Sequence, residues 1–236
     1  RSYANEWLYH ELLKSEGIMA LKYDFIRLTL NDEDLGIYAI EEHFGQHVPR
    51  DNDRPKGAIL RWNPELYWDW RIKELHGDFY DNQNGEYQNS FVEPYDKGTV
   101  RKDSLLTLTY LKGAEKLEGF RRGEYSASQV FDIDLMAKFH AVIDLVGGYH
   151  SLDWSDIKFF YNQDSDKIEP IGYESFSIRE TIAVAGQRSP EPGDNLNLNY
   201  HDQLFSDPIF YEAYINQLMR ICDKKYFSEF QKKVKP

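Results

Sequence analysis

The sequence predicts an α+β fold in two lobes. Strand-like alternation dominates the first hundred residues, helical spacing dominates the rest, and one hairpin pattern lies between two helical segments. Of the 236 residues, 41% are hydrophobic and 29% are charged, which is typical of a globular chain rather than a disordered one. We therefore expect a single domain over residues 1–236, with strands mainly in 1–104 and helices mainly in 105–236.

The first lobe begins with a helical pattern over residues 3–16. Residues 23–42 are predicted to form a β-hairpin, because YDFIRLTL alternates, NDEDLG is a turn and GIYAIEE returns. Two sets of apolar side chains are expected to share a face, Tyr3, Trp7, Leu8 and Leu12 on the helix and Ile26, Leu28 and Leu30 on the hairpin. GAILRW is a further short strand, and residues 63–104 have no clear assignment.

The second lobe opens with a helix over residues 105–118, where Leu108, Leu111 and Leu117 have helical spacing. The clearest helix covers residues 131–148, with Asp132 or Asp134 as its cap and two glycines at its end. Cys222 falls in a later helical pattern and is expected in the core. As the only cysteine, it excludes an internal disulfide.

A second hairpin is predicted over residues 157–174, followed by a long loop over 178–200. A helix over 206–222 follows, with Ser206 as cap and Pro208 in its first turn, and a short helix over 225–234 closes the chain.

Two acidic residues lie at the open end of the second hairpin. Asp156 precedes the first arm, and Glu174 ends the second. They are either ligands of one divalent metal ion or two solvated acids at strand ends, and the residues alone leave both interpretations open.

Charge limits the partners. The net charge of −12 disfavours nucleic acid, whose binding depends on Lys and Arg, and favours either a basic partner or an acidic site that collects metal ions. No apolar run is long enough to span a membrane. The chain opens inside a helical pattern without Met, so we expect it to be a piece of a longer protein.

Four stretches, taken together and in order, resemble the CotH kinase family, the atypical protein kinases of the spore coat protein H type. They are NEWLYHELLKSEGIMALKYDFIRLTLNDEDLGIYAIEEHF, GGYHSLDWSDIKFFYN, KIEPIGYE and LFSDPIFYEAYINQLMRI. The resemblance implies a two-lobed, kinase-like fold that transfers the γ-phosphate of ATP to Ser or Thr of secreted or surface proteins, using Mg²⁺ or Mn²⁺. It also implies a location outside the cytoplasm and a basic, Ser-rich acceptor protein.

The resemblance also implies roles for single residues. Glu42 orients a basic residue, Arg61 stands for the strand Lys that binds ATP phosphate, and Asp156 and Glu174 stand for the metal-binding Asn and Asp. The catalytic base is one of three residues, Asp144, His150 or Asp153. Arg61 still binds phosphate as Lys does, and Glu174 keeps a carboxylate on a longer arm that suits Mn²⁺ or Ca²⁺ better than Mg²⁺.

Each role has a plainer alternative. Arg61 is also consistent with a surface residue, His150 with a structural hydrogen-bond partner, and Asp144 with a buried hydrogen-bonding acid. The GxGxxG, HRD and DFG motifs of ordinary kinases are absent from the sequence. Because Arg61, Asp156, Glu174 and His150 depart from the residue types of the family, a kinase-fold binding module that has lost catalysis is a second hypothesis. A glycan-acting protein is the third, disfavoured because Glu169 and Glu174, on one strand, would face opposite sides.

Overall fold

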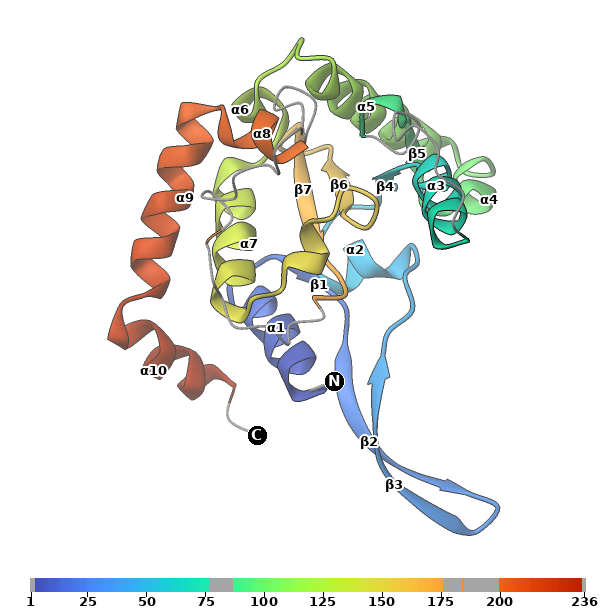
Figure 1. The fold of residues 1–236 in the computed structure, drawn as a ribbon, viewed down its shortest axis with the longest axis vertical. Coiled ribbons are helices and arrows are strands. Elements are labelled where there is room, and N and C mark those ends of the chain that lie inside the picture. The colour runs from blue at the N-terminus through green and yellow to red at the C-terminus, as the bar shows by residue number, and fades with distance from the viewer. Residues whose placement is uncertain (1–2, 77–86, 176–183, 185–199, 235–236) are drawn as a thin grey trace.

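The computed structural model describes residues 3–76, 87–175, 184 and 200–234, and these form a mixed α+β fold with a central sheet (Figure 1). The five-stranded sheet has the order β1 (Met19–Ala20), β7 (Lys167–Gly172), β6 (Lys158–Asn162), β4 (Ile59–Trp62), β5 (Val92–Pro94). β1 is parallel to β7, and the other neighbours are antiparallel. Strands from both sides of residue 104 therefore share one sheet, and the predicted hairpin over 157–174 is confirmed at its centre.

The helices surround this sheet. They are α1 (Tyr3–Ser15), α2 (His47–Asp51), α3 (Glu65–Leu75), α4 (Lys97–Val100), α5 (Ser104–Arg121), α6 (Ala127–Val130), α7 (Ile133–Val146), α8 (Tyr200–Phe205), α9 (Pro208–Ile221) and α10 (Lys224–Lys233), with 3-10 turns η2 (Tyr87–Asn89) and η3 (Tyr149–Leu152). Every predicted helix is present. The stretch without an assignment contains α3, η2, β5 and α4, and the predicted loop over 178–200 lies almost wholly outside the described residues.

The two faces of the sheet are covered differently. Phe159 and Tyr161 of β6 point into the main hydrophobic core, which α5 and α7 complete. Phe160, one residue out of phase, joins a smaller core with Ile59 and Phe44. Residues two apart on a strand share a face, so Arg61, two residues from Ile59, and Lys158, two residues from Phe160, lie on the same side as the smaller core. This less covered face carries the polar side chains described below.

α5 buries a different stripe from the predicted one. Leu108 and Leu111 are exposed by 48% and 57%, and only Leu117 of the expected three is in the core. The helix instead turns Gly113 toward the sheet, so closely that a Cβ there would lie 2.3 Å from Leu60 and 2.9 Å from Tyr161. Close approach of the backbone at this glycine sets the rotation of α5.

The buried face of α1 overlaps the predicted one only in part. The helix buries Tyr9, Leu12 and Leu13, whereas Tyr3 is exposed. Of the expected set, Leu12 is in the core and Leu8 packs against it while partly buried.

Helix ends were predicted in part. Asp132 caps α7 by accepting a hydrogen bond from the backbone N–H of Leu135, which settles the choice between Asp132 and Asp134. α9 is capped by Asp207, not Ser206, because the carboxylate of Asp207 accepts from two backbone N–H groups of the first turn. Cys222, predicted in the core, is exposed at the end of α9.

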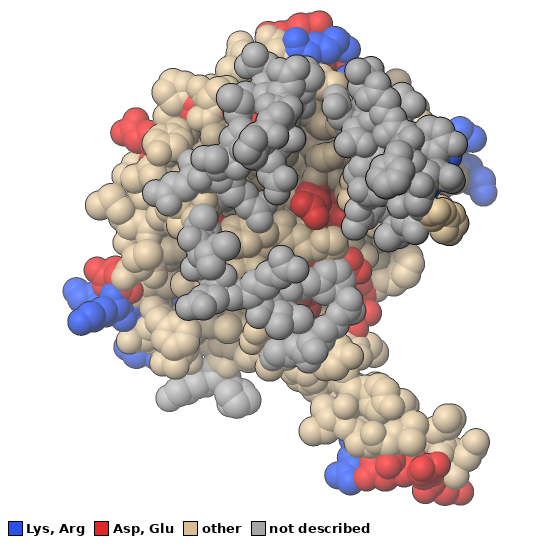
Figure 2. All heavy atoms as spheres, in the orientation of Figure 1, with Lys and Arg blue, Asp and Glu red and all other residues tan. Residues whose placement is uncertain are grey.

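The first predicted hairpin is confirmed as β2 (Tyr23–Leu30) and β3 (Glu33–Glu41), but it forms a separate two-stranded sheet. It extends from the body as an arm (Figures 1 and 2). Ile26 and Leu30, expected to share one face, are both exposed because no other described strand or helix covers the arm beyond its base. Among the described residues, no helix has the length and apolar character needed to cross a membrane.

Candidate functional site

A short turn between α7 and β6 carries His150. Gly147 ends α7 in the left-handed conformation, with φ 65°, and η3 follows directly. The turn packs against the residues after β7, since a Cβ on Gly148 would lie 2.8 Å from the Cβ of Ser175. Ser151 Oγ also donates a hydrogen bond of 2.6 Å to the carbonyl oxygen of Tyr173. These contacts bring His150 to the open end of the β6–β7 hairpin.

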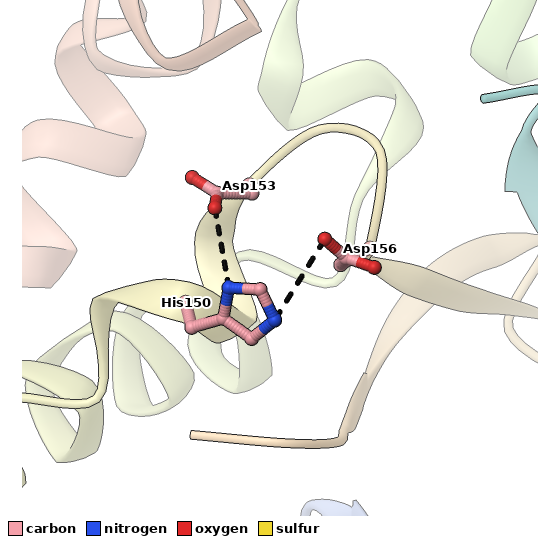
Figure 3. Close-up of side chains that lie close together, drawn as sticks. All are labelled: His150, Asp153 and Asp156. Atoms are coloured by element: carbon pink, nitrogen blue, oxygen red, sulfur yellow. Dashed lines mark ion pairs between the residues drawn. The ribbon is translucent and has the colours of Figure 1, made fainter. Parts of the chain in front are cut away.

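His150 lies among three carboxylates, and Figure 3 shows it between two of them, Asp153 and Asp156. Its Nδ1 is 3.3 Å from Asp153 Oδ2, and its Nε2 is 3.9 Å from Asp156 Oδ2 and 3.8 Å from Glu174 Oε2. The hydrogen bond with Asp153 raises the pKa of His150, partial burial opposes the rise, and the charges of all three acids add to it. The predicted pair Asp156 and Glu174 thus lies close to one nitrogen, Nε2, of His150, which was predicted as a candidate base.

Glu174 adopts an unusual backbone conformation. Its φ of 36° is in the left-handed region, where residues other than glycine are uncommon. The preceding residue, Tyr173, has its pKa raised by burial and by a hydrogen bond with the Glu174 carboxylate. Such strain is maintained by surrounding contacts and is concentrated at functional sites in proteins.

A buried lysine lies beside these acids. Lys158 is 4% exposed, its Nζ donates a hydrogen bond to the backbone oxygen of Asp156, and it lies 5.0 Å from the centre of the Tyr173 ring. Burial lowers the pKa of Lys158 to about 8, with the positive charge of Arg61 contributing and the carboxylates of Asp156 and Glu174 opposing. Lys158 therefore places a cation next to the acid cluster.

Arg61 faces a buried acid that the sequence did not single out. Its Nε and Nη2 donate hydrogen bonds of 2.9 and 2.7 Å to Glu93 Oε1 on the neighbouring strand. Glu93 also accepts from Lys97 at 2.6 Å and from Asn63 at 2.7 Å. Burial by itself would raise the pKa of Glu93, but these three partners lower it below its ordinary value. Arg61 is thus a held cation rather than a free surface side chain.

Three aromatic rings connect the two cations. Arg61 lies 5.3 Å from the centre of the Tyr95 ring, and Lys158 lies over Tyr173. Phe44 contacts both rings, with centroids 5.2 Å from Tyr95 and 4.8 Å from Tyr173. Arg61, the aromatic rings, Lys158 and the acid cluster therefore form one continuous arrangement on the less covered face of the sheet.

Two of the predicted site residues lie outside this arrangement. Glu42 accepts a hydrogen bond of 3.1 Å from the backbone N–H of Lys22, and its Oε1 is 3.5 Å from Lys22 Nζ and 3.3 Å from His47 Nε2. It contacts basic residues, but Arg61 pairs with Glu93. Asp144 is buried between α7 and α9, where it accepts a hydrogen bond of 2.5 Å from Tyr214 Oη. This bond supports the plainer reading of Asp144.

Lys158 and Glu93 were not predicted as site residues. Alternation along KFFYN places Lys158 on the same side as buried Phe160, which is a recognisable signal for a buried charge. No comparable signal existed for Glu93, because its short strand lay in the stretch without an assignment.

The acid cluster fits a divalent cation. One ligand atom each from His150, Asp153 and Asp156 can be chosen so that all lie within 4.8 Å of one another. Glu174 lies outside that group, but its Oε2 is 3.8 Å from His150 Nε2, so it can replace Asp153 as the third ligand after a side-chain rotation. Ligands of an octahedral ion with bonds near 2.1 Å lie about 3 Å apart when adjacent and about 4.2 Å apart when opposite, so small side-chain rotations suffice. Imidazole with carboxylates suits Mn²⁺ better than Mg²⁺.

Compared with models of protein families and with curated proteins, the chain matches none. The interpretation of the site therefore rests on its residues and their geometry.

Proposed function

We propose that this chain has an atypical kinase-like fold and is a metal-dependent phosphotransferase of the CotH type. It transfers the γ-phosphate of ATP to Ser or Thr of a basic secreted or surface protein. One observation carries the proposal: Asp156 and Glu174, which flank the two strands at the open end of a hairpin, lie within 4 Å of the same nitrogen of His150. Phosphoryl transfer needs such a convergence of acids, because a divalent ion must neutralise the phosphates.

In this proposal the acidic residues and His150 bind the metal ion, and the basic residues bind phosphate. Asp156, Glu174 and His150 would hold Mn²⁺ or Mg²⁺, which supplies charge neutralisation when bound. Arg61 and Lys158, on the same sheet face, attract the phosphates of ATP. Asp153, whose side chain is 55% exposed, accepts the proton of the acceptor hydroxyl. The hydroxyl oxygen bonds to the γ-phosphorus as the bond from that phosphorus to the β–γ bridging oxygen breaks, and ADP leaves.

A second candidate is a kinase-fold module that binds nucleotide without catalysis. It is favoured by the position of two cations. The Lys158 ammonium already lies beside the acids, and two N–H groups of Arg61 are already hydrogen-bonded to Glu93. Both arrangements would hinder the movement of phosphate oxygens toward an ion.

Calorimetric titration with ATP and MnCl₂ tests the proposal. The parent should bind ATP only with the metal, and Asp156→Ala and Glu174→Ala should each weaken binding at least about tenfold, the loss of one charged ligand. Asp164→Ala is the matched control, because it removes an exposed acid from the opposite end of the same hairpin. Thermal melting should show that all three variants remain folded.

Transfer is measured separately, with labelled ATP, Mn²⁺ and a Ser-rich, Lys/Arg-rich peptide. Label on the peptide, lost in Asp153→Asn while metal-dependent ATP binding persists, supports the phosphotransferase. Metal-dependent binding without any transfer supports the binding module. Equal binding by the parent and both acid variants would rule out the metal site and leave the acids as solvated strand ends.

A further inference from the structure

The β2–β3 arm joins the body of the protein at its base. There Tyr23 is buried and its ring stacks on His10 at 5.6 Å, while the rest of both strands is mostly exposed. Within the described parts of the chain, β2 and β3 pair only with each other. An isolated two-stranded hairpin is only marginally stable in water, so an arm of this length is a candidate for binding a partner.

Apolar side chains lie on both faces of the arm. Paired residues of an antiparallel hairpin share a face, which places Ile26 with Tyr38 on one side and Phe25 with Ala39 on the other. Ile37 is in register with Arg27 on the second face and is 79% exposed. Leu30, Leu35 and Ile40 are also exposed large hydrophobic residues. Isolated exposed apolar residues are ordinary, but a contiguous set on one projecting element marks an interaction site.

The outer edges of the arm are open as well. Each strand uses one edge for its partner, and the other edge faces no described strand. A long, apolar edge strand presents backbone N–H and C=O groups to an extended chain that can add as a further strand.

Charge specifies the partner. Between Tyr23 and Glu41 the arm has five acidic residues and one basic residue. Arg27, the basic one, already pairs with Asp34. Figure 2 shows acidic side chains along the tip, with the basic side chain beside them. A segment with Lys or Arg between apolar residues complements this surface. A second copy of the arm or an anionic membrane would be repelled by it.

We propose that the β2–β3 arm is the docking site for an extended segment of another protein in which apolar residues alternate with Lys or Arg. The segment adds as a strand to one edge, its backbone completes the hydrogen bonding, and its basic side chains pair with the acids of the arm. This inference is independent of the phosphotransferase proposal, because it uses none of the residues assigned to that site.

Fluorescence anisotropy with the capped, labelled peptide VKVKVKVK tests the docking. The parent protein should bind it, and should bind VEVEVEVE and SKSKSKSK at least about tenfold more weakly, because each lacks one half of the complementarity. Ile26→Thr with Ile37→Thr should weaken binding about tenfold, since threonine keeps the β-propensity but removes apolar surface. Asp32→Asn with Glu33→Gln should weaken it about threefold and reduce its dependence on salt, and asparagine suits the left-handed φ of 64° at position 32.

Leu111→Gln is the matched control, because it removes a comparably exposed apolar side chain from the body, and it should bind as the parent does. Three results would overturn the proposal. The first is no binding of VKVKVKVK, or equal binding by the Ile26→Thr, Ile37→Thr variant. The second is a dimer in sedimentation velocity that this variant dissociates. The third is binding of the parent to anionic phosphatidylserine vesicles through the arm.

Discussion

The two hairpins of this protein have nearly the same local design and opposite surroundings. Both consist of two antiparallel strands joined by a tight turn with positive φ at non-glycine positions, Asn31 and Asp32 in the arm and Asp166 in the β6–β7 hairpin. The β6–β7 hairpin lies in the middle of the sheet, where Phe159 and Phe160 are fully buried. The β2–β3 hairpin projects into solvent with apolar side chains on both faces. Local pattern therefore fixes strand pairing, whereas burial depends on what the rest of the chain places beside the strands.

The polar contacts of the two hairpins differ in the same way. Glu169 of β7 is 3% exposed and accepts hydrogen bonds of 2.6 Å from both Arg54 Nε and Asn162 Nδ2. Arg27 and Asp34 of the arm also pair, but both side chains are largely in solvent. The first pair is shielded by the fold, while the second is screened by water and salt.

Truncation of a phenylalanine should give the largest difference in stability loss between the two hairpins. Phe159→Ala should lower the free energy of unfolding by about 3–5 kcal/mol, because it leaves a cavity in the main core. Phe25→Ala, at a side chain 39% exposed on the arm, should cost less than about 1 kcal/mol. Urea denaturation followed by circular dichroism measures both. Similar losses in the two variants would mean that the arm is covered in solution.

The ion pairs give a smaller contrast. Glu169→Gln should cost about 2 kcal/mol, since the amide has only one oxygen for two donors and leaves one of them unsatisfied inside the fold. Arg27→Gln on the arm should leave the denaturation midpoint unchanged, because its side chain is 75% exposed. Repeating both titrations in 1 M NaCl sharpens the comparison, as the loss in Glu169→Gln should persist there.

Glycine substitutions in the two turns should give the smallest effect. It is informative because the change in amide hydrogen-exchange rate should have opposite signs in the two hairpins. Asp32→Gly relieves a φ of 64° in the arm and should slow amide hydrogen exchange in β2 and β3 slightly. Asp166→Gly relieves a φ of 56° but removes the acceptor of Tyr161 Oη at 2.8 Å and of Lys116 Nζ at 3.0 Å. Exchange in β6 and β7 should therefore become faster. Slower exchange in both hairpins would show that backbone strain outweighs the contacts of Asp166.

The candidate site lies where the buried hairpin ends. Glu174 lies two residues after β7 and has a positive φ. His150 lies beside it, in the turn that follows Gly147 and Gly148. Four of the seven residues named from the sequence, His150, Asp153, Asp156 and Glu174, come together there. Arg61 is held nearby on the same face by Glu93, whereas Glu42 and Asp144 have other partners.

The sequence by itself determined the local elements. Alternation and turn residues predicted both hairpins, and periodicity with caps predicted α7, because these signals depend on neighbours a few residues away. Only the tertiary structure decided that β6 and β7 join β4 in one sheet while β2 and β3 remain outside it. It also decided that α5 turns Gly113 rather than Leu108 inward, and that Glu93, which the sequence did not single out, holds Arg61. These outcomes depend on close packing between segments far apart in the chain, and the periodicity of one segment does not specify which distant segments it packs against.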